Sequence, residues 1–433
     1  MDRPRFDAVD GRAGPEGAPR PAGPTRGGNR LAHAAAVFGP GLVVMLADTD
    51  VGSVITAGQS GVQWGYRLLL LQLVLIPVLY CMQELTVRLG IFTGRGHGEL
   101  ICSTFGRFWG WVSAAGLATA TAGALLTEMS GVAGVGELYG VPRAASLTLA
   151  TVALLAVVAT GSYRRVERFA IAVGLFELAF FAVAWAARPD WQAMLHGALS
   201  FPLGNRDYLY LVAANIGAVV MPWMIFYQQS AVADKRLRPE HYAAARWDTA
   251  IGAVVTQLVM AAVLIATAAT IGAKTPNASL STVGEMSLAL VPFLGPAAGR
   301  FVFSIGVLGA AMVAAIVASL ALAWGIGEIA GYRRSLEYRP LQARWFYGVY
   351  AVCVVAGAVL VATWPDLVAL NIGVQVMNAF LLPLVLGFLV ALAMRALPEG
   401  RRPGGVYAWV VIVVAALTAG LGVFGGLQGA GLF

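Results

Sequence analysis

The chain has 433 residues, of which 59% are hydrophobic and only 12% are charged, and its mean hydropathy is +0.75. Soluble domains carry about 25% charged residues, so this composition excludes an ordinary soluble protein and predicts a polytopic membrane protein. The formal net charge of +7 comes from arginines in the loops and is not a signal for nucleic-acid binding. Three cysteines without CxxC spacing give neither a disulfide framework nor a thiolate metal site.

The chain begins with a Pro-, Gly- and Arg-rich tail at residues 1–30, which has no apolar signal-peptide core, and we expect it to be disordered and cytoplasmic. Residues 31–433 are predicted to form a single transmembrane domain of all-α class. Eleven apolar segments are long enough to cross a bilayer, which takes about 20 residues per helix. These predicted spans cover residues 33–60, 66–89, 108–138, 143–162, 167–187, 207–232, 246–272, 300–329, 343–364, 367–394 and 405–425.

The positions of lysine and arginine predict the orientation of the spans. With a cytoplasmic N-terminus, 23 of the 29 basic residues fall on the cytoplasmic side and six on the other. Short cytoplasmic loops carry the excess of Lys and Arg, so this bias favours a cytoplasmic N-terminus. With eleven spans, the C-terminus is then extracytoplasmic.

Two predicted helices are interrupted near their middle. The first contains Asp50-Val51-Gly52-Ser53, and the sixth contains Asn215 followed by Gly217 and Met221-Pro222. These are the first spans of two five-span halves, about 31–190 and 205–396, which run in opposite directions and leave an eleventh helix at about 405–425. Broken helices at matching positions of inverted halves indicate a midplane transport site. In the alternative interpretation, Pro222 only kinks a helix and Gly52 only allows close packing.

Two acidic residues, Asp48 and Asp50, lie in the middle of the first predicted span. An aspartate at the bilayer midplane costs roughly 2.5–3.5 kcal/mol on insertion scales, so two in three residues are hard to explain as passive structure. Both are tolerable if they face a cation in a polar cavity, where unwound backbone also offers carbonyl ligands. We expect Asp50, which begins the break, to ligate directly, and Asp48 to lie behind it or on its access path.

Other polar residues within the spans are candidates for cavity lining. Glu128 lies in the middle of the third predicted span, and Gln375 and Asn378 share one face of the tenth. Interhelical hydrogen bonding is the alternative role for all three. Met221 at the second break is usually core filler, but its thioether is also a soft metal ligand. All four histidines fall at span ends or in loops, so a midplane histidine relay is not available.

The motifs together resemble the Nramp family of divalent-metal transporters (natural resistance-associated macrophage proteins) over nearly all of residues 33–425. Gly39-Pro40 precedes Asp50-Val51-Gly52-Ser53 at the spacing of the family's Gly-Pro and Asp-Pro-Gly-Asn motifs. The segment 218–223 is similar to the family's Ala-x-x-Met-Pro-His, and 87–94 to its Arg/Lys-Leu-Gly-Ile-x-Thr-Gly loop. Gln375 matches a glutamine or asparagine near the family's site. The resemblance implies the LeuT-like 5+5 inverted-repeat fold with broken helices 1 and 6.

The resemblance also implies a ligand set for the transported ion. Asp50 would ligate by its carboxylate, Ala218 by its backbone carbonyl and Met221 by its sulfur, while Ser53 replaces the family's asparagine ligand with a shorter side chain. Asp48, Gln375, Glu128 and Trp223 are secondary candidates; Asp48 is an additional carboxylate, and Trp223 replaces a histidine associated with proton movement.

The departures from the family pattern fall mostly in its proton-coupling residues. Besides Trp223, Gln228 replaces a second histidine, Glu128 replaces an aspartate, and Gly131 replaces a glutamate. Such departures resemble the Nramp-related magnesium transporter branch, which implies uptake of Mg²⁺, often with Mn²⁺, without proton coupling. Mg²⁺ keeps several waters and needs only one or two carboxylates, which suits a wider site. Met221 argues the other way unless a water separates it from the ion.

We therefore expect a divalent cation transporter that imports Mg²⁺, and Mn²⁺ as well, without proton coupling. The membrane potential alone supplies about 4.6 kcal/mol per 100 mV to a divalent ion. One alternative is a proton-coupled Mn²⁺/Fe²⁺ importer in which Glu128 and Asp48 handle the proton, and another is an organic-solute symporter of the same fold. An enzyme is not expected, because there is no nucleophile–base pair, phosphate loop or sizeable soluble domain. We expect no cofactor, nucleic acid or obligate protein partner, and a location in the plasma (inner) membrane of a prokaryote.

Overall fold

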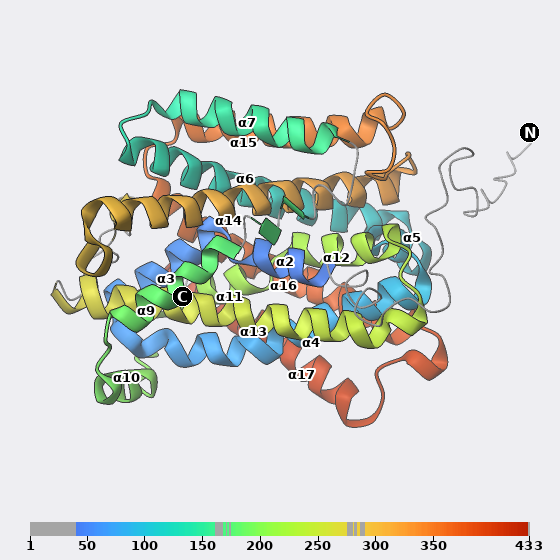
Figure 1. The fold of residues 1–433 in the computed structure, drawn as a ribbon. Helices are drawn as coiled ribbons and strands as arrows, with labels where there is room; N and C mark the ends of the chain where they lie inside the picture. Colours follow the sequence, from blue (N-terminus) through green and yellow to red (C-terminus); the bar gives the residue numbers. More distant parts are fainter. Residues whose placement is uncertain are drawn as a thin grey trace, which may run out of the picture. The chain divides into compact units, whose positions relative to one another are not determined.

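The computed structural model describes residues 40–160, 168–169, 171–172, 175–274, 280, 284–285 and 291–431 (Figure 1). All regular structure in these residues is helical, as predicted for the all-α class. The expected tail at 1–30 lies outside the described residues, as do residues 167, 170, 173 and 174 of the fifth predicted span.

The first half of the described chain contains most of the expected helices and two short additional ones. The additional helices, α5 (His97–Phe105) and α10 (Trp191–Ala198), were not predicted, because neither is long enough to resemble a span. The other elements are α2 (Pro40–Asp48), α3 (Val51–Trp64), η1 (Gly65–Leu68), α4 (Leu69–Thr93), α6 (Arg107–Leu138), α7 (Arg143–Ala159), η2 (Leu175–Leu178) and α9 (Ala179–Ala186).

The second half follows the predicted spans closely. Helix α14 is longer than predicted, and Gly295, with a φ of 77°, and Pro296 kink it near its start. The elements are α11 (Arg206–Val219), α12 (Pro222–Asp234), η3 (Pro239–His241), α13 (Tyr242–Thr267), a π-helical turn (Ala268–Gly272), α14 (Val291–Ala330), α15 (Arg344–Thr363), α16 (Leu367–Arg395), η6 (Glu399–Arg401) and α17 (Gly405–Gly429).

Within the described residues, seven segments are long and apolar enough to cross a membrane: Val51–Thr93, Arg206–Asp234, Pro239–Gly272, Gly295–Ala330, Arg344–Thr363, Leu367–Arg395 and Gly405–Gly429. The first joins α3 and α4, which belong to two predicted spans. Helices α6 and α7 occupy the third and fourth predicted spans, although α7 has only 17 residues. The count of eleven spans and the inversion of the two halves stay predictions.

Both predicted breaks are present, and the first begins one residue earlier than expected. Helix α2 ends at Asp48, and Asp50 is extended, with φ of −74° and ψ of 172°. Its Oδ1 atom accepts a hydrogen bond of 2.6 Å from the Ser53 backbone N–H, as an N-cap residue does. Gly52 and Ser53 therefore lie in the first turn of α3 and not in the break.

The second break lies at Val220 and Met221, between α11 and α12. Met221 is extended, with φ of −83° and ψ of 139°, and Pro222 is the first residue of α12. Proline is well suited to this position, because its fixed φ matches a helix start and its missing N–H would have no partner there. The prediction of a broken sixth helix is therefore confirmed.

Helix α13 supports the first broken helix along its length, since it packs against α2, α3 and α4 (Figure 1). The buried Asp248 on α13 accepts hydrogen bonds from the backbone N–H groups of Gly41, at 2.9 Å, and Leu42, at 3.2 Å. These donors open α2 and have no partner within the helix. A carboxylate at the positive end of the helix dipole thus fixes the start of α2.

We expect Asp248→Ala to destabilise the protein by about 1.5–3 kcal/mol, because hydrogen bonds to a charged acceptor contribute about that much. The change would be measured by denaturation in detergent micelles. Asp190→Ala is the matched control, since Asp190 caps α10 by accepting from Gln192 and Ala193 in an exposed position. An equal loss of unfolding free energy in the two variants would contradict a larger contribution from the buried Asp248 cap.

Candidate metal site

The helix segments beside the two breaks are in direct contact. The Ser53 hydroxyl, in the first turn of α3, donates a hydrogen bond of 3.1 Å to the Ala218 carbonyl, near the end of α11. Both residues are buried, with exposed fractions of 3% and 4%. Two of the predicted ligands, 165 positions apart in the chain, are therefore in contact.

Asp50 lies one turn before Ser53 and is completely buried. Its Oδ1 atom is used by the cap of α3, whereas Oδ2 is buried and accepts no hydrogen bond within the described residues. Glu128 on α6 is the acidic neighbour of Asp50, and the two side chains are close enough to interact. Glu128 also accepts from the backbone N–H of Val51 at 3.4 Å and from the Thr127 hydroxyl at 2.9 Å. The Asp50 Oδ2 atom thus has Glu128 as its polar neighbour, and a cation that binds this oxygen would compete with the Glu128 side chain for it.

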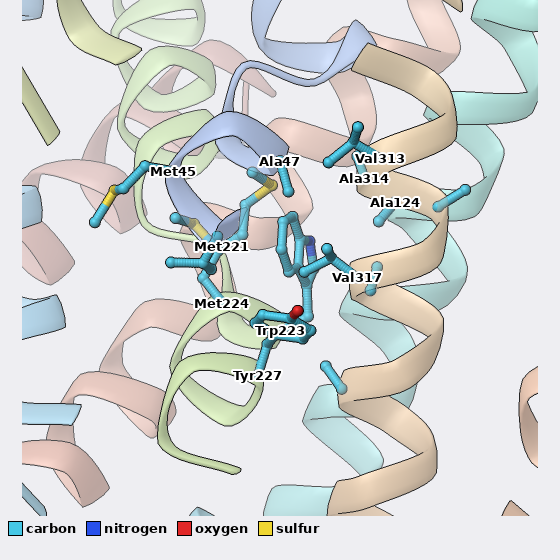
Figure 2. Close-up of a cluster of buried hydrophobic side chains, with 14 of the residues drawn as sticks. Met45, Ala47, Ala124, Met221, Trp223, Met224, Tyr227, Val313, Ala314 and Val317 are labelled. Atoms are coloured by element: carbon cyan, nitrogen blue, oxygen red, sulfur yellow. The ribbon is translucent and has the colours of Figure 1, made fainter. Parts of the chain in front are cut away.

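Met221 and Trp223 occupy apolar surroundings. Figure 2 shows both side chains in a buried cluster with Met224, Tyr227 and Val317. Trp223 is fully buried, and its indole N–H has no hydrogen-bond acceptor among the described residues. The structure therefore places Met221 at the second break, as predicted, but packs its side chain among hydrocarbon, and it gives Trp223 no polar contact.

Gln375 on α16 reaches the first turn of α3. A Cβ atom at Gly52 would lie 2.0 Å from the Gln375 Nε2 atom, so a larger residue would require the Gln375 side chain to move. The same side chain accepts a hydrogen bond of 3.0 Å from Asn378, one turn further along α16. This hydrogen bond of Asn378 lies within α16 and does not join two helices. The Gln375 amide nitrogen has no acceptor in the described part of the chain.

Asp48 faces a different space from Asp50. It lines a narrow pocket together with Ser53, Gln72, Asn215, Ala218, Val219, Gln257 and Met260. Its exposed fraction is 1%, and neither carboxylate oxygen has a hydrogen-bond donor among the described residues. The sequence analysis overlooked Gln72 and Gln257, because a single amide within an apolar helix is usually an interhelical hydrogen-bonding group.

The proton-coupling departures have structural counterparts. A Cβ atom at Gly131 would lie 2.4 Å from the Val51 Cγ2 atom, so the valine fills the space over this glycine. Gln228 is held on both sides, accepting from Thr86 at 2.7 Å and donating to Thr249 at 2.9 Å. Neither position has a free acidic or basic group.

No group of three or more His, Cys, Asp or Glu side chains gathers into a metal cluster in the described ranges. A site made from one carboxylate, a backbone carbonyl, a hydroxyl and a thioether would not appear as such a cluster.

Solved structures with a similar fold include a metal transporter. A manganese transporter of Eremococcus coleocola matches with a TM-score of 0.76 at 18% identity, covering 94% of this chain and 89% of that one. MhsT in complex with L-phenylalanine matches with a TM-score of 0.59 at 14% identity, covering 94% of this chain and 100% of that one. These likenesses show that the chain has the LeuT-like fold of a multi-pass membrane protein.

The sequence comparisons identify the family. Proteins called divalent metal cation transporter MntH are similar to this chain: that of Brucella suis is 28% identical over 68% of this chain and 67% of its own. The protein of Yersinia enterocolitica is 30% identical over 66% of this chain and 71% of its own. The protein of Burkholderia ambifaria is 27% identical over 84% of this chain and 82% of its own. The profile of the natural resistance-associated macrophage protein-like family matches residues 41–428, so the chain belongs to the Nramp family and is a transporter, not an enzyme.

Proposed function

We propose that this chain carries divalent metal cations across the cytoplasmic membrane of a bacterium, with Mn²⁺ as its principal cargo. The observation that carries the proposal is the contact between Ser53 and Ala218 beside the free oxygen of Asp50. Family membership and the names of the bacterial relatives support the same cargo class. The manganese transporter of Eremococcus coleocola, which has the same fold, supports the Mn²⁺ alternative of the sequence analysis over its first choice, Mg²⁺.

The ligand set follows from the groups at the breaks. Asp50 supplies Oδ2, Ser53 its hydroxyl oxygen, and Ala218 the carbonyl that now accepts from Ser53. Met221 supplies its sulfur after a rotation away from the apolar cluster (Figure 2). A thioether suits transition metals better than Mg²⁺ or Ca²⁺, so this set favours Mn²⁺ among biological divalent ions.

Magnesium is the second candidate, because of Ser53 and Asp48. A serine arm is shorter than the family's asparagine, and Asp48 adds a carboxylate on the other side of Ser53. Mg²⁺ is held through retained waters and one or two carboxylates, which such an enlarged, oxygen-rich site would favour. The packing of Met221 among hydrocarbon fits this candidate as well, since Mg²⁺ would not need the sulfur.

Proton coupling is supported at one position and opposed at three. Glu128 lies beside Asp50, where a proton released on metal binding would be taken up. Gly131, Trp223 and Gln228 offer no titrating group for its onward path. We propose transport driven by the membrane potential, with Glu128 limited to exchanging a proton with Asp50.

We expect Asp50→Asn to abolish Mn²⁺ uptake into proteoliposomes, because the variant keeps the shape of the side chain and removes its charge. Loss of a hydrogen-bonded charged ligand of this kind lowers metal affinity by about 10- to 100-fold or more. Asp190→Asn, at the exposed cap of α10, is the control with the same chemical change. Normal uptake by Asp50→Asn would refute the proposed ligand set.

Ser53→Asn restores the family's longer arm and should shift selectivity toward Mn²⁺ over Mg²⁺. The measurement is competition of Mg²⁺ against Mn²⁺ uptake, with a pH-sensitive dye inside the vesicles. We expect Mg²⁺ to compete less well in Ser53→Asn than in the unaltered protein. We also expect no acidification with uptake, so acidification in step with Mn²⁺ entry would contradict transport driven by potential alone.

Gly131→Ala should destabilise the protein, because the added methyl group meets Val51 at 2.4 Å. Overpacking of a buried site typically costs about 1–3 kcal/mol. Val51→Ala should remove most of this penalty, and a double-mutant cycle in detergent would measure the coupling. Additive effects of the two substitutions would contradict the packing of Val51 over Gly131.

A further inference from the structure

The pocket beside Asp48 is built mainly of polar groups from several helices. Asp48 ends α2, Gln72 lies in the first turn of α4, Asn215 in the last turns of α11, and Gln257 in the middle of α13. Ser53 borders the pocket and also contacts Ala218 at the meeting of the breaks. Ala218 lines the pocket as well, so the pocket shares two proposed ligands, Ser53 and Ala218, with the Asp50 site, while Asp50 itself is not among its lining residues.

Several polar atoms in this pocket have no partner. Both carboxylate oxygens of Asp48, both polar side-chain atoms of Gln257 and the Oε1 atom of Gln72 are buried without a hydrogen bond in the described part of the chain. The three side chains are exposed by 1% or less. Burying unpaired polar groups is unfavourable, and nearly all such groups in folded proteins have partners. Their convergence on one pocket points to a missing ligand.

Asn215 shows what a structural amide in this region looks like. Its Nδ2 atom donates to the Ser60 hydroxyl at 2.9 Å and to the Leu211 carbonyl at 2.6 Å, and its Oδ1 atom accepts from Gln72 at 2.5 Å. Both of its N–H donors and its amide oxygen therefore have partners. The contrast with Gln257 separates residues that hold the helices together from residues that face a ligand.

The charge of the pocket selects a cation. Its lining includes the Asp48 carboxylate and no basic residue, and Asp50 and Glu177 are close enough to repel a charged Asp48. The unpaired acceptors are carboxylate and amide oxygens, which are the ligands that hard divalent cations prefer. No sulfur ligand is required at this position.

We propose that this pocket is a second divalent-cation site, with Asp48, Gln257 and Gln72 as its ligands. This inference rests on the proposed function, because the ion is the same cargo. Gln72 lies near the start of α4, on the side that the basic residues predict to be extracytoplasmic. The site would hold an arriving ion before the ion passes Ser53 to Asp50.

The first test measures binding, separately from transport. Electron paramagnetic resonance of free Mn²⁺ gives the number of ions bound by the full chain in detergent. We expect two ions per chain, one of which survives Asp50→Asn and is weakened by about tenfold or more in Asp48→Asn. Glu177→Gln is the matched control, because it neutralises a neighbouring buried carboxylate outside the pocket and should change the stoichiometry little.

A second variant tests the site by adding a ligand, so its result does not depend on a loss of binding. Gln257→Glu places another carboxylate in the pocket at nearly unchanged volume, and we expect tighter Mn²⁺ binding with slower uptake. Asp48→Asn should instead raise the external Mn²⁺ concentration that gives half-maximal uptake. If Asp48→Asn fails to fold, as judged by gel filtration, Gln257→Glu decides the question alone.

The outcomes separate the two proposals. If Asp50→Asn abolishes uptake while Asp48→Asn and Gln257→Glu leave both binding and half-saturation unchanged, the second site is refuted and the proposed function stands. If the unaltered protein carries neither Mn²⁺ nor Mg²⁺, the proposed function is refuted first. A single bound ion that survives Asp48→Asn and is lost in Asp50→Asn also refutes the second site.

Discussion

The contact between the two helix breaks is the constraint on which the site depends. In a bilayer, backbone groups released by a break need partners, because neither lipid nor bulk water supplies them. Here the start of α3 is capped locally, and it also supplies a partner for the end of α11. Asp50 accepts from the Ser53 N–H, and the Ser53 hydroxyl donates to the Ala218 carbonyl. A cation that binds here would take over groups that already hold the breaks together, so binding would exchange contacts and couple the ion to the position of α3 relative to α11.

The buried carboxylates near the first break differ in the groups that face them. Asp248 is a structural acid, since the N–H groups at the start of α2 compensate its charge. Asp48, Asp50 and Glu128 instead lie close to one another in sequence or space, with incomplete hydrogen bonding at both aspartates. Like charges in a medium of low dielectric constant repel strongly. A divalent cation would relieve this repulsion, which explains how a helix so apolar can carry acids at its break.

The sequence predicted the long helices and both breaks, because hydropathy and the backbone preferences of Gly and Pro are local properties of the chain. It placed the first break one residue too late, since Gly52 is a conspicuous helix breaker and Asp50 is a less conspicuous N-cap. The contact of Ser53 with Ala218 could be expected only from the resemblance to the family, as no local rule joins residues 165 positions apart. Gln72 and Gln257 were missed because an amide in an apolar helix has the same appearance in a sequence whether it is bonded or not. Only the arrangement of α4 and α13 around Asp48 distinguishes the two cases.

The departures from the family pattern are best understood as pairs of residues in contact. Val51 stands where the family has proline, and Gly131 stands where it has glutamate. In the structure the valine methyl groups occupy the space over the glycine. An acid at residue 131 would therefore displace Val51 from the first turn of α3, immediately beside Asp50. The loss of the acid and the gain of the valine are one change in packing, which replaces a polar route with hydrocarbon. A proton that leaves Asp50 would then have Glu128 as its nearest acceptor and no acidic residue one turn further along α6. Ser53 contacts Ala218 and Val51 contacts Glu128, so the proposed roles in ion selectivity and in proton exchange depend on different contacts of the first turn of α3.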